Sequence, residues 1–279
     1  MEVFIVAGIV TYNPDLDRLR ENVESISSQV EKVLIFDNGS KNQEEIKKIY
    51  KDEVVLITSP KNIGIAAALN RLMQRSGDLG ATWMLSLDQD SVCSDSFCVE
   101  MSHFLEREPD FGIVAPVIVD RNIGVVGHNP DKEYETVRTC ITSGAFTKIE
   151  VWKEIGEYDE SMFIDSVDFE FCYRVRQAGY KVVQVRDVQL LHEIGKSEKR
   201  KFIAWTIDVK NHSAFRKYYI ARNNVYYPLK HHLWLHFIRG NLRNIWLLMT
   251  VMLYENDKKP KIISIIKGWN NGLLNKGEK

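Results

Sequence analysis

Cysteine and long apolar runs are scarce in this sequence, and both shortages exclude classes of protein. The four cysteines have neither the CxxC spacing of zinc or redox sites nor the density of a disulfide scaffold. No apolar run reaches the roughly 20 residues of a membrane-spanning helix, and the N-terminus lacks the basic start and cleavage site of a signal peptide. We therefore expect a cytoplasmic chain without a transmembrane segment, in which Cys172 is a buried free thiol.

Acidic residues are scarce in the last third of the chain, although the whole chain is close to neutral. The 279 residues include 37 Lys and Arg against 38 Asp and Glu. Residues 196–279 contain 17 basic and 5 acidic side chains, a net charge of about +12, and the rest of the chain carries about −13. This asymmetry indicates that the tail meets an anionic surface, either the acidic remainder of the chain or a membrane leaflet. We expect no nucleic-acid partner.

Short apolar runs alternate with amphipathic helical stretches in the first half of the chain. This alternation predicts βαβ units and an α/β fold, with a Rossmann-like, mainly parallel sheet flanked by helices. The predicted strands are residues 4–10, 33–36, 54–57, 83–87 and 113–115, and the predicted helices are residues 16–29, 43–50, 65–75 and 94–107. Shorter strands between residues 122 and 147 indicate that the sheet becomes mixed.

The pattern changes towards helices in the second half. A helix is expected over residues 167–177 and a strand, or a pair of strands, over residues 181–191. After that no strand pattern is convincing, and helical segments follow with breaks at Gly240 and Pro260. The predicted parts are residues 1–195, with halves of about 1–120 and 121–195, and a basic, aromatic-rich helical appendage over residues 196–279.

Asp88 and Asp90 directly follow an uncharged strand and form the first candidate site. Ligands of open α/β sheets bind at the carboxyl ends of strands. Two hard oxygen donors one residue apart suit Mg²⁺ or Mn²⁺ carrying a diphosphate. His192 follows a later strand and is a candidate third ligand, although a lone histidine is more often a surface or core group.

Polar loops are expected at the same sheet edge, where a nucleotide would lie. Asp37 can accept the imide N–H of uracil or thymine, with Thr11 and Tyr12 flanking the base; alternatively its turn only caps the next helix. Asn62 and Gly64 precede a helix whose first turns hold small residues. Gly64 lets the backbone approach a ribose or phosphate, or these small residues only allow close packing on the sheet.

Three carboxylates mark the start of the helix predicted at residues 167–177. Asp168 is a candidate general base that removes a proton from an acceptor hydroxyl, although capping of the helix needs only one or two of the three. Asp168 and Glu170 lie about 200° apart around a helix of 3.6 residues per turn. They cannot both point into one site, so one of them is expected to have a structural role.

Seven motifs in order resemble the GT-A glycosyltransferases of family 2, over roughly residues 3–195. The motifs are Thr11-Tyr12-Asn13-Pro14, Asp37-Asn38-Gly39-Ser40, Asn62-x-Gly64, Leu87-Asp88-Gln89-Asp90-Ser91, Thr142-Ser143-Gly144, Phe163-Ile164-Asp165-x-x-Asp168-x-Glu170 and Leu191-His192. The fourth and sixth motifs, together with Tyr218-Tyr219-x-x-Arg222-Asn223 in the tail, look like the bacterial rhamnosyltransferase branch.

The resemblance implies a GT-A fold and an inverting transfer of one sugar, with dTDP-L-rhamnose as the favoured donor. Asp168 matches the catalytic base of the family, which deprotonates the acceptor hydroxyl. The implied metal ligands for Mg²⁺ or Mn²⁺ are Asp88, Asp90 and His192. The implied donor-binding residues are Thr11, Tyr12, Asp37, Asn62, Gly64, Asp88 and Gln89, and the implied acceptor-side residues are Ser143, Gly144, Asp165 and Glu170. A lipid-linked or oligosaccharide acceptor in bacterial surface polysaccharide synthesis is expected.

The tail is expected to lie on the inner face of the cell membrane. Residues 245–254 are too short to span a bilayer but can lie in its interface, with Trp234 and Trp246 as anchors. Lys258, Lys259 and Lys261 would meet anionic headgroups. Alternatively, the apolar positions of these helices pack on the rest of the chain or form a homodimer.

Three other functions remain alternatives. A UDP-sugar donor, such as UDP-galactofuranose or another UDP-hexose, would keep the same fold and mechanism, because the imide that Asp37 can contact is common to uracil and thymine. A sugar-phosphate nucleotidyltransferase shares the strand-end metal site, but its early Gly-rich loop with Arg and Lys is replaced in this chain by Thr11-Tyr12-Asn13-Pro14. A membrane scaffold without activity would need a broken site, and the site carboxylates are present.

Overall fold

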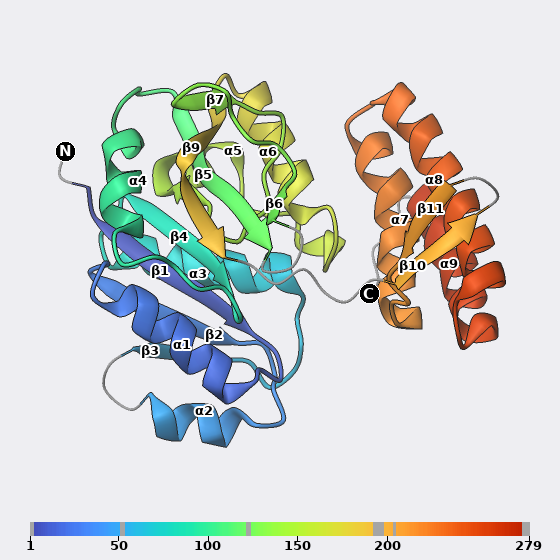
Figure 1. Cartoon of the computed structure of the whole chain (residues 1–279), viewed down its shortest axis with the longest axis horizontal. Coiled ribbons are helices and arrows are strands. Elements are labelled where there is room, and N and C mark those ends of the chain that lie inside the picture. Colours follow the sequence, from blue (N-terminus) through green and yellow to red (C-terminus); the bar gives the residue numbers. More distant parts are fainter. Residues whose placement is uncertain (1–2, 51–53, 121–123, 192–197, 203–204, 275–279) are drawn as a thin grey trace. The chain divides into compact units, whose positions relative to one another are not determined.

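The chain forms two compact units, which the computed structural model describes over residues 3–50, 54–120, 124–191, 198–202 and 205–274 (Figure 1). The first unit comprises Met1–Glu160 and Asp168–Glu193, and the second comprises Ser161–Val167 and Ile194–Lys279. The second unit thus combines a short segment, Ser161–Val167, with the tail that begins at Ile194.

A parallel half-sheet forms the start of the first unit, as the alternating pattern predicts. Its strand order is β3-β2-β1-β4, all parallel. The strands are β1 (Ile5–Thr11), β2 (Lys32–Asp37), β3 (Val55–Thr58) and β4 (Trp83–Asp88), and the helices are α1 (Leu16–Ser27), α2 (Gln43–Ile49), α3 (Ile65–Asp78) and α4 (Phe97–Leu105). The strand register places Thr11 beside Asp37, and Val10 beside Asp88. The carboxyl ends of these three strands therefore meet at one edge.

Local sequence signals explain why these elements form where they do. Asp15 caps α1 by accepting from the N–H groups of Asp17 and Arg18. Leu19, Val23 and Ile26 recur at helical spacing and are buried against the sheet.

The sheet continues as a mixed half, which confirms the predicted change of pattern. Strand β8 lies antiparallel between β4 and β5, and β9 pairs parallel with β5. The additional elements are β5 (Phe111–Asp120), β6 (Gly124–Val126), β7 (Tyr134–Thr136), β8 (Phe146–Lys148), β9 (Lys181–Leu191), α5 (Ile149–Ile155), the 3₁₀ turn η1 (Glu160–Met162) and α6 (Val167–Gln177). Because β8 joins β4 to β5, the loop before β8 reaches the edge that carries Asp88.

The second unit is mainly helical but contains a hairpin that the sequence did not reveal. Its elements are β10 (Glu198–Phe202), β11 (Trp205–Val209), α7 (Ala214–Lys230), α8 (Trp234–Tyr254) and α9 (Lys258–Leu273). The prediction of no strands after residue 195 is wrong for the antiparallel pair β10–β11. The run Glu-Lys-Arg-Lys lacks the apolar alternation by which strands are recognised.

Gly240 lies inside α8 rather than at a break, and the reason is close helix packing. A Cβ atom built there would lie 1.9 Å from the carbonyl oxygen of Asn224 on α7. Gly268 and Gly272 on α9 approach the α7 carbonyls of Tyr218 and Arg222 in the same way, at 2.1 and 2.5 Å. Helices α8 and α9 thus each contact α7 through its backbone.

All four cysteines are free, and Cys172 is buried, as predicted. Burial raises the pKa of the Cys98 thiol to about 12, so this side chain stays protonated and unreactive. No helix among the described residues has the length and apolar character that crossing a membrane requires.

Candidate active site

Asp37 lies at the carboxyl end of β2, with its carboxylate fully enclosed. One oxygen is 3.2 Å from the Thr11 hydroxyl. The other accepts from the backbone N–H of Ser40 at 3.2 Å and from the side-chain amide of Gln43 at 2.6 Å. Asp37 has no exposed surface, so in this conformation it organises the end of the strand; reading of a base by its carboxylate stays a prediction.

The loop after Asp37 packs directly on the loop that contains Asn62 and Gly64. Asn38 accepts from the N–H of Ile63 at 2.8 Å and donates to the carbonyl oxygen of Gly64 at 3.3 Å. Asn62 accepts from the N–H of Gly64 at 2.9 Å, and Gly64 has a φ of 90°, which favours glycine. These hydrogen bonds join the two loops at the sheet edge where the nucleotide is predicted to bind.

Asp88 and Asp90 lie at the end of β4 and are both half-buried. Gln89 between them accepts from the N–H of Tyr12 at 2.9 Å, which connects this loop to the end of β1. The backbone of Asp88 is fixed from two sides: its carbonyl accepts from Asn22 at 2.6 Å and its N–H donates to the Ser143 hydroxyl at 3.2 Å. These backbone contacts set where the Asp88 side chain begins at the sheet edge.

The donor set at this edge fits a hard divalent cation that also binds substrate oxygens. Among the described residues, no group of three or more His, Cys, Asp and Glu side chains could hold a metal. Of the three predicted ligands, the described residues include the two carboxylates, Asp88 and Asp90. His192 lies outside the described residues. One or two carboxylates, completed by phosphate oxygens and water, are the usual set for Mg²⁺ in sites that bind phosphorylated substrates.

The segment Cys140–Gly144 connects the sheet edge that carries Asp88 to the surroundings of Asp168. Ser143 is buried. Its hydroxyl lies 2.7 Å from the hydroxyl of Ser91, and it also accepts from the backbone N–H of Asp88. Gly144 has a φ of 80° and a Cβ atom there would lie 2.8 Å from Leu190 and Pro116. Cys140 lies close to Cys172 and Asp168: the Cys172 thiol, then burial, and also the charge of Asp168 raise the pKa of Cys140.

Asp168 is half-buried in the first turn of α6, and its carboxylate accepts from the N–H of Phe169 at 2.9 Å. Beside it is a cavity of about 130 Å³ in the first unit, whose wall includes Pro116, His128, Thr139, Ser143 and Phe169. Phe169 is 42% exposed. Ser143 and Phe169, the residue after Asp168, thus line one cavity. Asp168 itself lines a smaller neighbouring cavity with Cys140 and Thr142.

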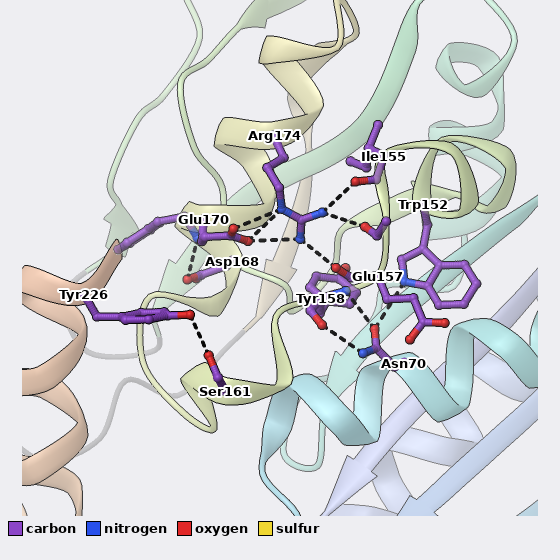
Figure 2. A network of polar contacts seen from close by, with 12 residues as sticks. Asn70, Trp152, Ile155, Glu157, Tyr158, Ser161, Asp168, Glu170, Arg174 and Tyr226 are labelled. Atoms are coloured by element: carbon purple, nitrogen blue, oxygen red, sulfur yellow. Dashed lines mark hydrogen bonds and ion pairs between the residues drawn. The ribbon is translucent and has the colours of Figure 1, made fainter. Parts of the chain in front are cut away.

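Glu170 has a different environment from Asp168, two residues before it (Figure 2). It has no exposed surface, and both of its oxygens accept from the Nε of Arg174 at 3.0 Å. Arg174 also donates to the carbonyls of residues 155, 156 and 157, at 3.0, 2.6 and 2.7 Å. Glu170 therefore has the structural role expected for one of these two carboxylates, and this environment offers no support for the predicted acceptor contact.

Asp165 belongs to the second unit, where it forms a bidentate ion pair with Arg216 on α7, at 3.0 and 3.2 Å. Its φ is 65°, a left-handed conformation that is rare for residues other than glycine. Sequence reasoning missed Arg216, and it also missed Asn22 and Arg174, which fix loops of the first unit. Asn38 stood in a motif, but no role was predicted for it. Only Arg174 had a readable signal, a glutamate four residues before an arginine on one helix.

Comparison with known proteins shows the family to which the chain belongs. The family described as "Glycosyl transferase family 2" matches residues 7–168. The chain is 31% identical over 247 residues to the dTDP-rhamnosyl transferase RfbF of Shigella flexneri, covering 82% of this chain and 81% of that protein. The chain belongs to glycosyl transferase family 2, and it is a glycosyltransferase similar to a bacterial rhamnosyltransferase.

Solved structures share the fold. The structure of S. aureus TarS 1-349 in complex with UDP-GlcNAc superposes with a TM-score of 0.61 at 14% identity, over 97% of this chain and 81% of that one. GalNAc-T7 with UDP, GalNAc and Mn²⁺ gives a TM-score of 0.60 at 14% identity. That match includes 98% of this chain but only 56% of the GalNAc-T7 chain. The predicted fold, a mainly parallel GT-A sheet flanked by helices with a helical C-terminal part, is confirmed.

Proposed function

We propose that the protein transfers L-rhamnose from dTDP-L-rhamnose to a hydroxyl of a saccharide acceptor, with inversion at the anomeric carbon. The observation that carries the proposal is the similarity to RfbF over four-fifths of both chains. The geometry supports it, because the edge of β1, β2 and β4 joins through Ser143 to the segment beside Asp168. A lipid-linked acceptor of surface polysaccharide synthesis would suit such a transfer.

Asp168 would act as the base in a single displacement. Its carboxylate takes the proton of the acceptor hydroxyl as the oxygen attacks the anomeric carbon, and the nucleoside diphosphate leaves from the opposite face. The cavity lined by His128, Thr139 and Phe169 would receive the acceptor sugar, since an aromatic ring beside polar groups suits a saccharide. Asp88 and Asp90 would hold Mg²⁺ or Mn²⁺, which would neutralise charge on the leaving diphosphate.

The donor and the cation can be tested together by calorimetry. We expect dTDP-L-rhamnose to bind in the presence of Mn²⁺ and UDP-hexoses to bind at least tenfold more weakly. Chelation with EDTA, or Asp90→Ala, should weaken donor binding by at least tenfold because the diphosphate loses its cation. Preference for UDP-galactofuranose or another UDP-hexose would refute the proposed donor. Equal donor affinity with Mn²⁺ and with EDTA would refute the proposed role of the metal ion in donor binding.

The outer face of α8 and α9 is the surface that we propose for contact with a membrane. Exposed apolar residues recur at helical spacing along α8 and continue on α9; they include Trp234, Leu235, Ile238, Leu242, Ile245, Trp246, Ile263 and Ile266. Arg239, Arg243, Lys258 and Lys259 are exposed on the same helices. Lys261, expected to meet headgroups with them, is instead buried in an ion pair with Glu255 at 3.1 Å. Apolar anchors combined with basic side chains favour an anionic lipid surface, at about 1 kcal/mol per basic residue.

Vesicle sedimentation tests this surface. We expect the protein to sediment with phosphatidylglycerol vesicles but weakly with phosphatidylcholine, and Leu235→Glu/Ile238→Glu to reduce the bound fraction at least tenfold. Val99→Glu is the matched control, since Val99 is 62% exposed on α4, outside the tail. If the double variant instead abolished a dimer in light scattering and left vesicle binding intact, the face would be a homodimer interface and the membrane proposal would be wrong.

A further inference from the structure

The tail motif Tyr218-Tyr219-x-x-Arg222-Asn223 has no part in the proposed chemistry, yet α7 presents a polar and aromatic stripe built around it. Arg216, Tyr219, Asn223 and Tyr226 follow one another at spacings of three, four and three residues, which places them on one face of the helix. All four contact the short segment Ser161–Asp165. We call this segment the base-proximal loop, because it ends three residues before Asp168.

Asn223 makes the central contacts. Its side-chain nitrogen lies 3.0, 2.9 and 2.8 Å from the carbonyl oxygens of residues 162, 164 and 165. Asn223 is buried, and its own oxygen accepts from the guanidinium of Arg222 at 2.8 Å. This last bond fixes the orientation of the amide, because a flipped amide would place its oxygen against three carbonyls.

The other members of the stripe hold the two ends and the middle of the loop. Tyr219 stacks on Phe163, with ring centroids 4.8 Å apart. The Ser161 hydroxyl donates to that of Tyr226 at 2.9 Å, as Figure 2 shows. Arg216 forms its ion pair with Asp165 at the far end.

The loop needs such restraint because its backbone is strained. Phe163 and Asp165 in the loop, and Ser166 directly after it, have φ values of 57°, 65° and 65°. A left-handed conformation costs a residue other than glycine about 1 kcal/mol or more, and it persists only where the surroundings impose it. Three such residues among four consecutive ones would relax if the stripe released them.

We propose that Asn223 is a positioning residue, which holds the base-proximal loop in its strained conformation and thereby sets the position of Asp168. Helix α6 begins at Val167, two residues after the loop ends, so the loop backbone sets the direction from which the chain enters the first turn of α6. This inference rests on the proposed role of Asp168 as the base. It assigns the Arg222-Asn223 pair a part in turnover without contact with the substrates.

The test compares Asn223→Ala with Asn224→Ala in the full-length protein. Asn224 is the next residue, but its amide bonds to Asn244 on α8 and not to the loop. Release of nucleoside diphosphate from dTDP-L-rhamnose, with water as acceptor, gives kcat and KM. We expect Asn223→Ala to lower kcat at least tenfold with KM within twofold of wild type, and Asn224→Ala to leave both unchanged. Hydrogen exchange should accelerate in residues 161–167 of Asn223→Ala while α8 and α9 keep their protection.

Equal losses of kcat and thermal stability in the two variants would overturn the inference, and so would wild-type kcat in Asn223→Ala. If Asn223→Ala does not fold, Tyr226→Phe replaces it as the test, because this substitution removes only the hydroxyl that bonds to Ser161. We expect kcat of Tyr226→Phe to be about threefold lower than that of wild type. An unchanged kcat refutes the proposal. Asp168→Asn distinguishes failure of the proposed base from failure of the proposed positioning role. Wild-type turnover in Asp168→Asn disproves the base itself, whereas inactive Asp168→Asn with fully active Asn223→Ala disproves only the positioning role.

Discussion

Asp168→Asn is expected to lower kcat for nucleotide-sugar turnover by about 10²–10⁴-fold, the usual contribution of a positioned general base. The amide oxygen of asparagine can still accept from the N–H of Phe169, so the start of α6 keeps its geometry. Asparagine cannot take a proton from the acceptor hydroxyl. Donor affinity, measured by calorimetry, should stay within about twofold of wild type.

Asp165→Asn is the informative partner of this variant, because both residues are carboxylates next to the start of α6. Asp165 forms an ion pair with Arg216, and its replacement should weaken the base-proximal loop and lower kcat by a smaller factor than Asp168→Asn. If the order were reversed, with Asp165→Asn inactive and Asp168→Asn nearly normal, Asp165 would be the base.

Glu170→Gln is expected to lower the free energy of unfolding more than any of the substitutions at the sheet edge or on α7. Arg174, whose side chain is 17% exposed, would lose the fully buried carboxylate that neutralises it, and removing one partner of such a pair costs about 3–5 kcal/mol. Since a domain of this size loses about 2–4 °C of Tm per kcal/mol, Tm should fall by roughly 6–20 °C. Calorimetric or fluorescence-monitored unfolding measures the shift.

Glu44→Gln provides the matched control. It also breaks an ion pair within one helix, with Lys47 at 2.7 Å, but both side chains are exposed. Exposed pairs contribute little, so Tm should not change measurably. A Glu170→Gln protein with normal Tm but a raised KM for an acceptor would contradict the packing role and restore Glu170 to the acceptor side.

The parallel half of the sheet could be predicted because its signals are local. Uncharged runs such as Trp83–Leu87 identify buried strands, and the turn residues after them mark the strand ends. A parallel arrangement then brings Thr11, Asp37 and Asp88 to one edge without further information. The hairpin β10–β11 gave no such signal, because its first strand is almost entirely charged.

The roles of individual site residues depended on contacts that no local pattern encodes. Helical geometry predicted that Asp168 and Glu170 diverge, but only the position of Arg174 and the carbonyls near Gly156 shows that Glu170 is the buried one. Asn223 was noticed as part of a motif. Its three carbonyl partners lie about sixty residues earlier in the chain, a separation at which spacing carries no information.

The glycines of the second unit also determine which changes of chain length this unit can accept. Gly268 and Gly272 on α9 face the carbonyls of Tyr218 and Arg222, so the two parallel helices are matched residue by residue. One residue inserted at the beginning of α9, around Lys258–Lys259, would bring Lys267 and Asn271 to the positions that now accept only a hydrogen atom. The register of α9 against α7 is therefore locked, and homologous chains should vary in length at the turn between α7 and α8 or beyond Leu273, but not within the first turns of α9.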